Sequence, residues 1–152
     1  MPTRNAHARW EGSLKGGKGH VDFGNGAFNA PYSFSSRFEN GLGTNPEELL
    51  GAAHASCFAM ALSMILGKAD LEPDYVDATA QVTVSPQDGS FRITRSHLVC
   101  EAKVTGIDQE TFMQHANAAK AGCPVSQALA GVEITLDAKL AADPVVRGIG
   151  AA

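Results

Sequence analysis

The sequence is poor in the features that mark several common classes of protein. Its 152 residues include 3 cysteines, 1 tryptophan and 18% charged residues, and its Lys and Arg residues are scattered. Three cysteines without a C-x-x-C pair are too few for a disulfide framework, and they give no sign of a structural zinc site. A formal net charge of −4 with no basic cluster argues against nucleic acid and anionic membranes as main partners.

The N-terminal stretch MPTRNAHARWEG lacks the apolar core and small-residue cleavage site of a signal peptide, which predicts a cytoplasmic protein. A chain of this length, 44% hydrophobic, is long enough for one core and short for two. We therefore predict a single domain over residues 1–152, in which residues 141–152 form a mobile tail.

One long apolar run stands out, at residues 49–66. It is at the lower length limit for a membrane span and is interrupted by His54, Ser56 and Ser63, so the sequence favours a soluble fold without a membrane-spanning segment. A helix that is apolar on every face should be central and covered on both sides. A small domain with about six strands covers one side, so the second cover is expected from another subunit.

Turn signals and alternating apolar residues predict the strands. GGKG and GNG separate short strands within residues 5–37, PQDG joins strands at 75–85 and 91–104, and a last strand covers 132–140. The apolar residues change phase along the longest strand, which predicts a β-bulge near residues 95–97. Cys100 falls among apolar positions of this strand and is predicted to be a packing residue.

Capping residues predict the helices. In GTNPEEL, Asn45 is a favourable N-cap, Pro46 suits the first helical position, and Glu48 stands where a capping-box acid reaches back. This helix should run over residues 46–66 and end at Gly67. A further helix should begin after its cap, Asp108, and end near residue 122.

In AGCPVSQAL, Cys123 precedes a proline that can open a short helix. A thiol at such an N-terminus has its pKa lowered by the helix dipole. This cysteine is therefore a candidate reactive thiol.

Cys57 lies inside the apolar run, where burial would raise its pKa and leave it inert unless a cation comes near. His54 and Arg37 are the candidates. We expect Arg37 on a strand and favour it because arginine keeps its charge, with Glu47 or Glu48 fixing its orientation. Since Glu47 is about 15 Å from Cys57 along a straight helix, the helix is bent, Arg37 bridges the gap, or a second subunit supplies a residue.

Three runs carry a family resemblance: RFENGLGTNPEELLGAAHASCFAMALSMILG, AKAGCPVSQAL and the opening ARWEGSLKGGKG. Over about residues 7–140 the chain resembles the osmotically inducible protein C (OsmC) branch of the OsmC/Ohr family of thiol-dependent hydroperoxide reductases. The resemblance implies an α+β fold in which antiparallel sheets wrap around long central helices. It also implies an intertwined homodimer with active sites at the subunit boundary.

The same resemblance implies a peroxidase for organic hydroperoxides with a role for each site residue. Cys57 is the peroxidatic cysteine that becomes a sulfenic acid, and Cys123 is the resolving cysteine that forms a disulfide with it. Arg37 lies near the thiolate, and Glu47 holds this arginine. An external dithiol, with a lipoyl-type dithiol as a candidate, reduces the disulfide, and no metal, haem or flavin takes part.

Two alternatives stay open at the level of sequence. The first is a non-catalytic stress protein that senses redox state or binds a small apolar ligand. The second is a metal site made by Cys57, His54 and Cys123, which is disfavoured because no fourth ligand is evident.

Overall fold

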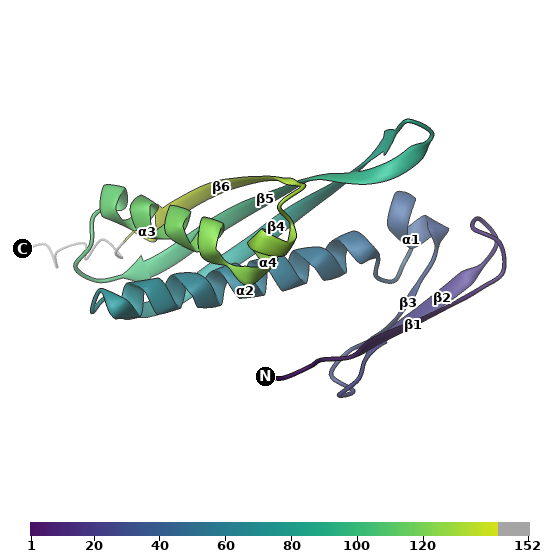
Figure 1. The fold of residues 1–152 in the computed structure, drawn as a ribbon, viewed down its shortest axis with the longest axis horizontal. Coiled ribbons are helices and arrows are strands. Elements are labelled where there is room, and N and C mark those ends of the chain that lie inside the picture. The colour runs from purple at the N-terminus through teal and green to yellow at the C-terminus, as the bar shows by residue number, and fades with distance from the viewer. Residues whose placement is uncertain (143–152) are drawn as a thin grey trace, which may run out of the picture. The chain divides into compact units, whose positions relative to one another are not determined.

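The computed structural model describes residues 1–142 and confirms the predicted α+β class (Figure 1). The elements are β1 (Ala6–Glu11), β2 (Lys18–Phe23), β3 (Asn29–Tyr32), α1 (Phe34–Phe38), α2 (Pro46–Lys68), β4 (Pro73–Gln87), β5 (Ser90–Val104), α3 (Gln109–Gly122), α4 (Pro124–Ala128) and β6 (Glu133–Leu140). The chain forms two compact units, Met1–Leu50 and Gly51–Ala152, and each is described by itself. The single domain stays a prediction, and all but the first two residues of the predicted tail lie outside the described residues.

In the first unit, β1, β2 and β3 form an antiparallel sheet in that order, as the turn signals predicted. Gly19 makes the close packing of this sheet possible. A Cβ atom there would collide with the ring of Tyr32 and lie 2.7 Å from that of Trp10, and these two rings pack at a centroid distance of 5.4 Å. A larger residue at this position would force the two rings apart.

The prediction that Arg37 lies on a strand is wrong, because Arg37 lies in α1. This short helix begins with a capping box between two serines. The Ser36 amide donates to the Ser33 hydroxyl oxygen at 3.0 Å, and the Ser33 amide donates to the Ser36 oxygen at 2.9 Å. A serine stands here in place of the usual Glu or Gln at the third helical position, so the start of the helix carries a weak sequence signal.

The second unit contains a sheet of order β4-β5-β6, in which β4 and β5 are antiparallel and β5 and β6 are parallel. The predicted hairpin turn is present. Asp88 and Gly89 both have positive φ, 51° and 75°, as a type I′ turn requires.

The predicted bulge lies one residue from its expected position. Thr83 pairs with Arg95, whereas the next residue of β4, Val84, pairs with Ile93. Thr94 is therefore the extra residue that changes the phase of β5. This change turns the even-numbered residues that follow toward the core.

The core of the second unit lies between this sheet and the helices α2 and α3. Its buried members are Phe58, Leu62, Leu66, Leu98, Cys100, Ala102, Val104, Phe112, Ala116 and Ala119. Cys100 is 1% exposed and burial raises its pKa to about 11, which confirms it as a packing residue. Gly51 lets α2 approach the sheet, because a Cβ atom there would lie 3.1 Å from the Ala80 carbonyl oxygen.

The start of α2 follows the sequence prediction except at Glu48. The Asn45 side-chain oxygen accepts a hydrogen bond from the Glu48 amide at 2.8 Å, which confirms the N-cap. The Glu48 carboxylate accepts from the Thr44 hydroxyl at 3.4 Å, and the structure gives it no reciprocal capping bond with Asn45. Asn45 in turn donates to the Ser36 carbonyl at 3.0 Å, so the cap residue also holds α1.

The predicted stop at Gly67 is wrong, because α2 continues to Lys68. The chain turns at Asp70, whose φ is 58°, and the Leu71 amide donates to the Leu66 carbonyl at 2.9 Å. Aspartate tolerates the left-handed conformation better than most residues other than glycine. The turn residue is thus Asp70, and Gly67 stays helical.

The predicted starts of α3 and α4 are confirmed. The Asp108 carboxylate accepts from the Thr111 amide at 2.7 Å, and α3 ends at Gly122. Pro124 then opens α4, as predicted. Asp108 has a lowered pKa because this amide hydrogen bond favours its charged form.

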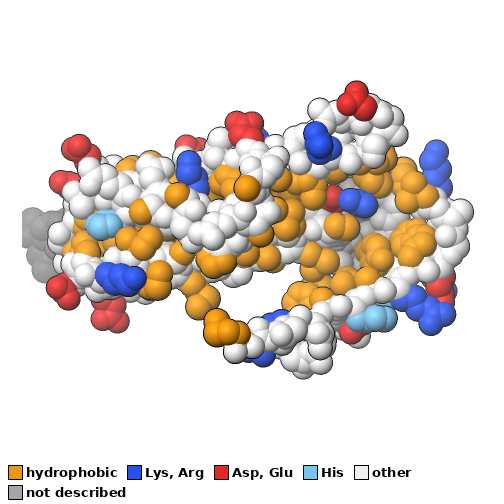
Figure 2. Space-filling model, in the orientation of Figure 1, with side chains coloured by type: hydrophobic (Ala, Val, Ile, Leu, Met, Phe, Trp, Pro, Cys, Tyr) orange, Lys and Arg blue, Asp and Glu red, His pale blue; other side chains and the backbone are white. Residues whose placement is uncertain are grey.

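Helix α2 is buried on one face and exposed on another. By length and composition it could cross a membrane. Only 28% of its most apolar window is buried within the chain, so most of this window is exposed. Met60 is 76% exposed and Met64 56%, and Figure 2 shows many hydrophobic side chains on the visible surface. The second unit therefore supplies only one of the two covers predicted for this helix.

Core packing gives a first prediction. Leu62 is completely buried and Leu42 is 96% exposed, so the same change to alanine tests burial alone. We expect Leu62→Ala to lower the free energy of unfolding by about 2–5 kcal/mol and Leu42→Ala by less than about 0.5 kcal/mol. Urea unfolding followed by circular dichroism at one protein concentration measures both, and equal effects would contradict the described core.

Candidate functional site

The structure brings together the two cysteines that the sequence marked as reactive. Cys57 lies in the middle of α2, and Cys123 is the N-cap residue of α4. Both are free thiols that share a hydrogen bond. Cys123 is completely buried and Cys57 is half-buried, so Cys57 is the thiol that a small molecule reaches first.

The surroundings of the two thiols move their pKa values in opposite directions. Burial raises the pKa of Cys57, and the hydrogen bond and charge of Cys123 raise it further, against a weaker opposing effect of the Val125 amide. Burial also disfavours the Cys123 thiolate, but hydrogen bonds from Cys57, from Ser126 and from the Val125 amide outweigh it and lower the pKa of Cys123. Within this unit, the shared negative charge is more stable on Cys123.

The lowered pKa of Cys123 agrees with the sequence prediction, but its physical source is more local than a helix dipole. Helix α4 has only five residues. Individual donors, namely the Ser126 hydroxyl and the amides of Val125 and Ser126, stabilise the charge instead.

In the first unit, Arg37 and Glu47 form an ion pair with fork geometry. Arg37 Nη2 donates to Glu47 Oε1 at 2.9 Å, and Nε lies 3.2 Å from both carboxylate oxygens. The Glu47 side chain is 8% exposed and that of Arg37 34%, and the guanidinium also lies 5.1 Å from the centre of the Phe38 ring. The guanidinium is thus held in one orientation, and Glu47, not Glu48, is its partner.

His54 is completely buried and both of its ring nitrogens are hydrogen-bonded. Nδ1 lies 2.7 Å from the Ser96 hydroxyl oxygen and Nε2 lies 2.8 Å from that of Ser126. Burial lowers the pKa of His54, so the ring is neutral at pH 7. His54 therefore supplies no positive charge to Cys57, and this candidate for the activating cation is wrong.

Sequence reasoning missed Ser96 and Ser126. Ser96 has the same parity along β5 as the buried Leu98 and Cys100, and a serine on a buried face predicts a polar partner inside. Ser126 lies in the short α4, where the sequence signal for the helix comes from Pro124 and draws no attention to the serine. Both serines bond to His54, which is distant from each of them in sequence, and Ser126 also bonds to the nearby Cys123.

Among residues 1–142 no group of three or more His, Cys, Asp or Glu residues is arranged to hold a metal ion. Both nitrogens of His54 are already engaged by serine hydroxyls. Nothing in this part of the chain supports the alternative of a metal site made by His54, Cys57 and Cys123.

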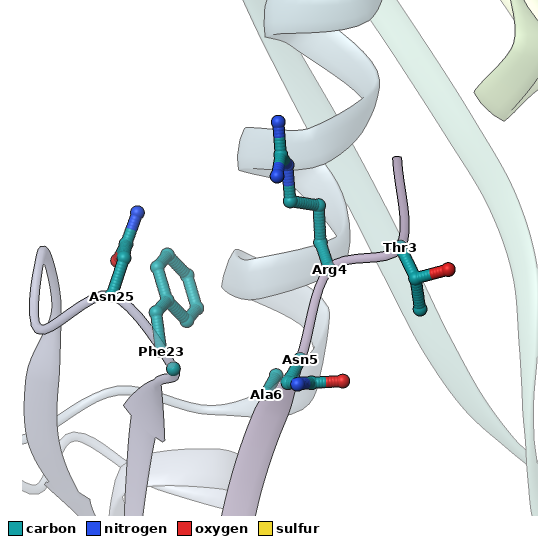
Figure 3. A pocket seen from close by; sticks show the side chains of 7 residues that line it. Thr3, Arg4, Asn5, Ala6, Phe23 and Asn25 are labelled. Carbon is teal, nitrogen blue, oxygen red and sulfur yellow. The ribbon is translucent and has the colours of Figure 1, made fainter. Parts of the chain in front are cut away.

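A surface hollow in the first unit has no candidate site residue in its lining. Figure 3 shows it at the start of β1 and the end of β2. It is lined by Thr3, Arg4, Asn5, Ala6, Phe23, Gly24 and Asn25. It contains no thiol and no acid, so it offers no group for the chemistry considered above.

Comparison with known proteins finds similar sequences over most of the chain. Residues 39–137 match the family model described as OsmC-like protein. The chain is 51% identical over 138 residues to "Peroxiredoxin OsmC" of Escherichia coli K12, covering 90% of this chain and 96% of that protein. It is 31% identical over 131 residues to "Organic hydroperoxide resistance protein OhrB" of Bacillus subtilis, covering 84% of this chain and 94% of that protein.

Solved structures show the same fold. The crystal structure of OhrB of Bacillus subtilis superposes with a TM-score of 0.71 at 28% identity, covering 89% of this chain and 98% of that one. An organic hydroperoxide resistance protein from Elizabethkingia anophelis gives 0.74 at 26% identity, covering 93% and 98%. The described fold therefore has experimental counterparts over most of its length.

The paired thiols give a second prediction. Removing Cys57 as a donor should raise the pKa of Cys123 in Cys57→Ala, whereas Cys123→Ala should lower the pKa of Cys57 by removing the hydrogen bond and charge that raise it. The ultraviolet absorbance of the thiolate, measured against pH in a Cys100→Ala background, gives the pKa of the one thiol that remains in each variant. Shifts in the same direction would contradict the described pairing.

Proposed function

The chain belongs to the OsmC-like protein family, and on that premise we propose that it is a cysteine-based peroxidase that reduces organic hydroperoxides to alcohols. The observation that carries the proposal is the pair of free thiols, Cys57 and Cys123, joined by a hydrogen bond. One is accessible and the other is buried behind it. Such a pair can take up an oxygen atom and close a disulfide without movement of distant parts of the chain.

The reaction follows from these residue types. The Cys57 thiolate attacks the outer oxygen of ROOH, the O–O bond breaks, and the leaving alkoxide takes a proton to become ROH. Cys57 is then a sulfenic acid. The Cys123 sulfur attacks the Cys57 sulfur, the S–O bond breaks, and water leaves as the disulfide forms.

An external dithiol closes the cycle. It reduces the disulfide by thiol–disulfide exchange and becomes oxidised itself, so each turnover consumes one hydroperoxide and one dithiol. A lipoyl-type dithiol is our candidate. The peroxidase needs no prosthetic group, because sulfur carries both the oxygen atom and the electrons.

The apolar surroundings of Cys57 favour hydroperoxides with hydrocarbon tails. The thiol lies on a helix that is apolar over most of its length, and the large side chains Phe58 and Leu62, which come after it in α2, are completely buried. A dry environment also protects a sulfenic acid until the second thiol reacts.

Arg37 and Glu47 complete the site in this proposal. The guanidinium stabilises the Cys57 thiolate and the charge that develops on the leaving oxygen, and Glu47 keeps it oriented. Because burial raises the pKa of Cys57, the thiol needs such a cation. We propose that the partner subunit of a homodimer supplies this pair.

A homodimer also accounts for the exposed face of α2. A second copy would cover Met60 and Met64, two large apolar side chains that are mostly exposed in one chain. Both sides of the helix would then be covered by protein, so the helix would need no membrane. We place the protein in the cytoplasm. Two half-covered helices can thus bury each other's apolar faces.

The raised pKa of Cys57 favours one alternative, a redox sensor that reacts once and does not turn over. Catalytic consumption of t-butyl hydroperoxide with a dithiol separates the two functions. A sensor consumes a single equivalent, whereas the peroxidase continues until the dithiol is exhausted.

The two-cysteine cycle gives a third prediction. Cys57→Ser should abolish turnover, because no thiolate attacks the peroxide, while Cys123→Ser should still be oxidised once but fail to form the intramolecular disulfide. Cys100→Ser is the matched control and should turn over normally. Steady-state consumption of t-butyl hydroperoxide with dihydrolipoamide measures all three, and full activity in either of the first two variants would refute the mechanism.

The shared site gives a fourth prediction, tested by mixing inactive variants. A dimer of one Cys57→Ser chain and one Arg37→Ala chain should regain turnover, because one site then combines a native Cys57 with a native Arg37 from the partner. Cys57→Ser mixed with Cys123→Ala should stay inactive, since both thiols belong to one chain. Exchange of subunits is verified by native mass spectrometry, and inactivity of the first mixture would place Arg37 in the same chain as the Cys57 that it serves.

A further inference from the structure

We propose that His54 is a positioning residue for the step in which Cys123 attacks the oxidised Cys57. The inference rests on the proposed peroxidase cycle and assigns to that cycle a residue that does not touch the peroxide. It starts from the hydrogen bonds of the buried imidazole ring with Ser96 and Ser126. These bonds join three elements of the second unit, α2, β5 and α4.

His54 anchors helix α4. Ser126 is the one residue of this five-residue helix that is buried, and its hydroxyl lies 2.8 Å from His54 Nε2. The helix begins directly after Cys123, so a shift of Ser126 moves the thiol. The histidine thereby fixes the position of the sulfur through a single buried hydrogen bond.

The hydrogen bonds around His54 have a defined direction. A neutral imidazole donates from one nitrogen and accepts at the other. The Ser126 hydroxyl donates to the Cys123 sulfur, so its oxygen is free to accept from His54 Nε2–H. His54 Nδ1 then accepts from the Ser96 hydroxyl. Each group thus donates toward the thiol: Ser96 to His54, His54 to Ser126, and Ser126 to Cys123.

This group of polar side chains is costly to bury. Ser96 and His54 are completely buried, and Ser126 is 5% exposed. Polar groups in an apolar core are stable only when all are paired, and an apolar residue at position 54 would avoid the requirement. A histidine that only filled space would not need its two nitrogens aimed at two different elements.

The chemical consequence concerns the resolving step. Cys123 attacks the Cys57 sulfenic sulfur, the new S–S bond forms as the S–O bond breaks, and hydroxide leaves and takes up the thiol proton as water. The attack requires the Cys123 sulfur to stay in line with the S–O bond. Without His54, the first oxidation proceeds, but the sulfenic acid lives longer and is open to further oxidation to sulfinic acid.

Two isosteric substitutions separate positioning from packing. The amide of glutamine reaches the place of Nε2 and can donate to Ser126, whereas the amide of asparagine reaches only the place of Nδ1 near Ser96. Both are neutral, polar and smaller than histidine, so both perturb the core. His54→Gln is therefore the matched control for His54→Asn.

The experiment is a single turnover of the full-length protein. Reduced protein is mixed with one equivalent of t-butyl hydroperoxide, quenched at intervals with dimedone and N-ethylmaleimide, and analysed by mass spectrometry for the Cys57 sulfenic acid and the Cys57–Cys123 disulfide. We expect His54→Asn to form the sulfenic acid at the normal rate but the disulfide about tenfold more slowly, the effect of one lost hydrogen bond. His54→Gln should restore most of the rate.

Ser126→Ala and Ser96→Ala provide a second set that leaves the histidine in place. The first removes the hydroxyl next to Cys123 and should slow disulfide formation as His54→Asn does. The second removes the distant hydroxyl and should have a smaller effect. The pKa of Cys123, read from the pH dependence of disulfide formation, should rise in the first variant more than in the second.

The outcomes are distinct. Normal disulfide formation in His54→Asn and Ser126→Ala, or equal slowing in His54→Asn and His54→Gln, would overturn the positioning role. If the native protein itself forms neither the sulfenic adduct nor the disulfide, the proposed peroxidase function fails instead. If His54→Asn does not fold, Ser96→Ala decides the matter, because it removes no donor to Cys123: slower disulfide formation supports the positioning role, and an unchanged rate overturns it.

Discussion

The contact between the start of α4 and the middle of α2 is the constraint on which the candidate site depends, because Cys123 and Cys57 meet only there. Helix α4 is short, and the core residues of α3 that precede it, Phe112, Ala116 and Ala119, are completely buried. Packing of α3 against the sheet therefore sets where α4 begins. Long-range packing in the second unit thus places one thiol next to the other.

The same packing creates the chemical problem that the rest of the site must solve. Burial that brings the two thiols together also removes the water that would stabilise a thiolate, and this raises the pKa of Cys57. The donors at the start of α4 stabilise a thiolate at Cys123 and do not offset the effect of burial on Cys57. A peroxidase with this geometry needs a cation at Cys57, and a neutral His54 does not provide one.

Sequence reasoning succeeded where the signal is local. Asn45 and Asp108 cap their helices because a short polar side chain can reach the free amides of the first turn, and this needs no information from elsewhere in the chain. The turn at Asp88 and the phase change at Thr94 are also local. Most of the element boundaries could be read in this way.

The failures have physical reasons of two kinds. Arg37 was expected on a strand because a serine pair that forms a capping box resembles an ordinary loop. Gly67 was taken as a stop because glycine often ends a helix, whereas the residue that adopts the left-handed conformation is Asp70. The serines around His54 were missed for a different reason. Their hydrogen bonds join residues far apart in sequence, and only the fold brings these residues together.

The separation of the two thiols in pKa gives the proposed cycle its order. In one chain, burial and the contact with Cys123 raise the pKa of Cys57, and hydrogen bonds lower the pKa of Cys123. In the proposed dimer, the guanidinium of Arg37 would stabilise a thiolate at Cys57 and draw the charge to the accessible sulfur, since opposite charge lowers a thiol pKa. Once Cys57 is a sulfenic acid it no longer competes for the charge. The hydroxyl and amide donors around Cys123 then favour the second thiolate at the moment when the cycle needs a second nucleophile.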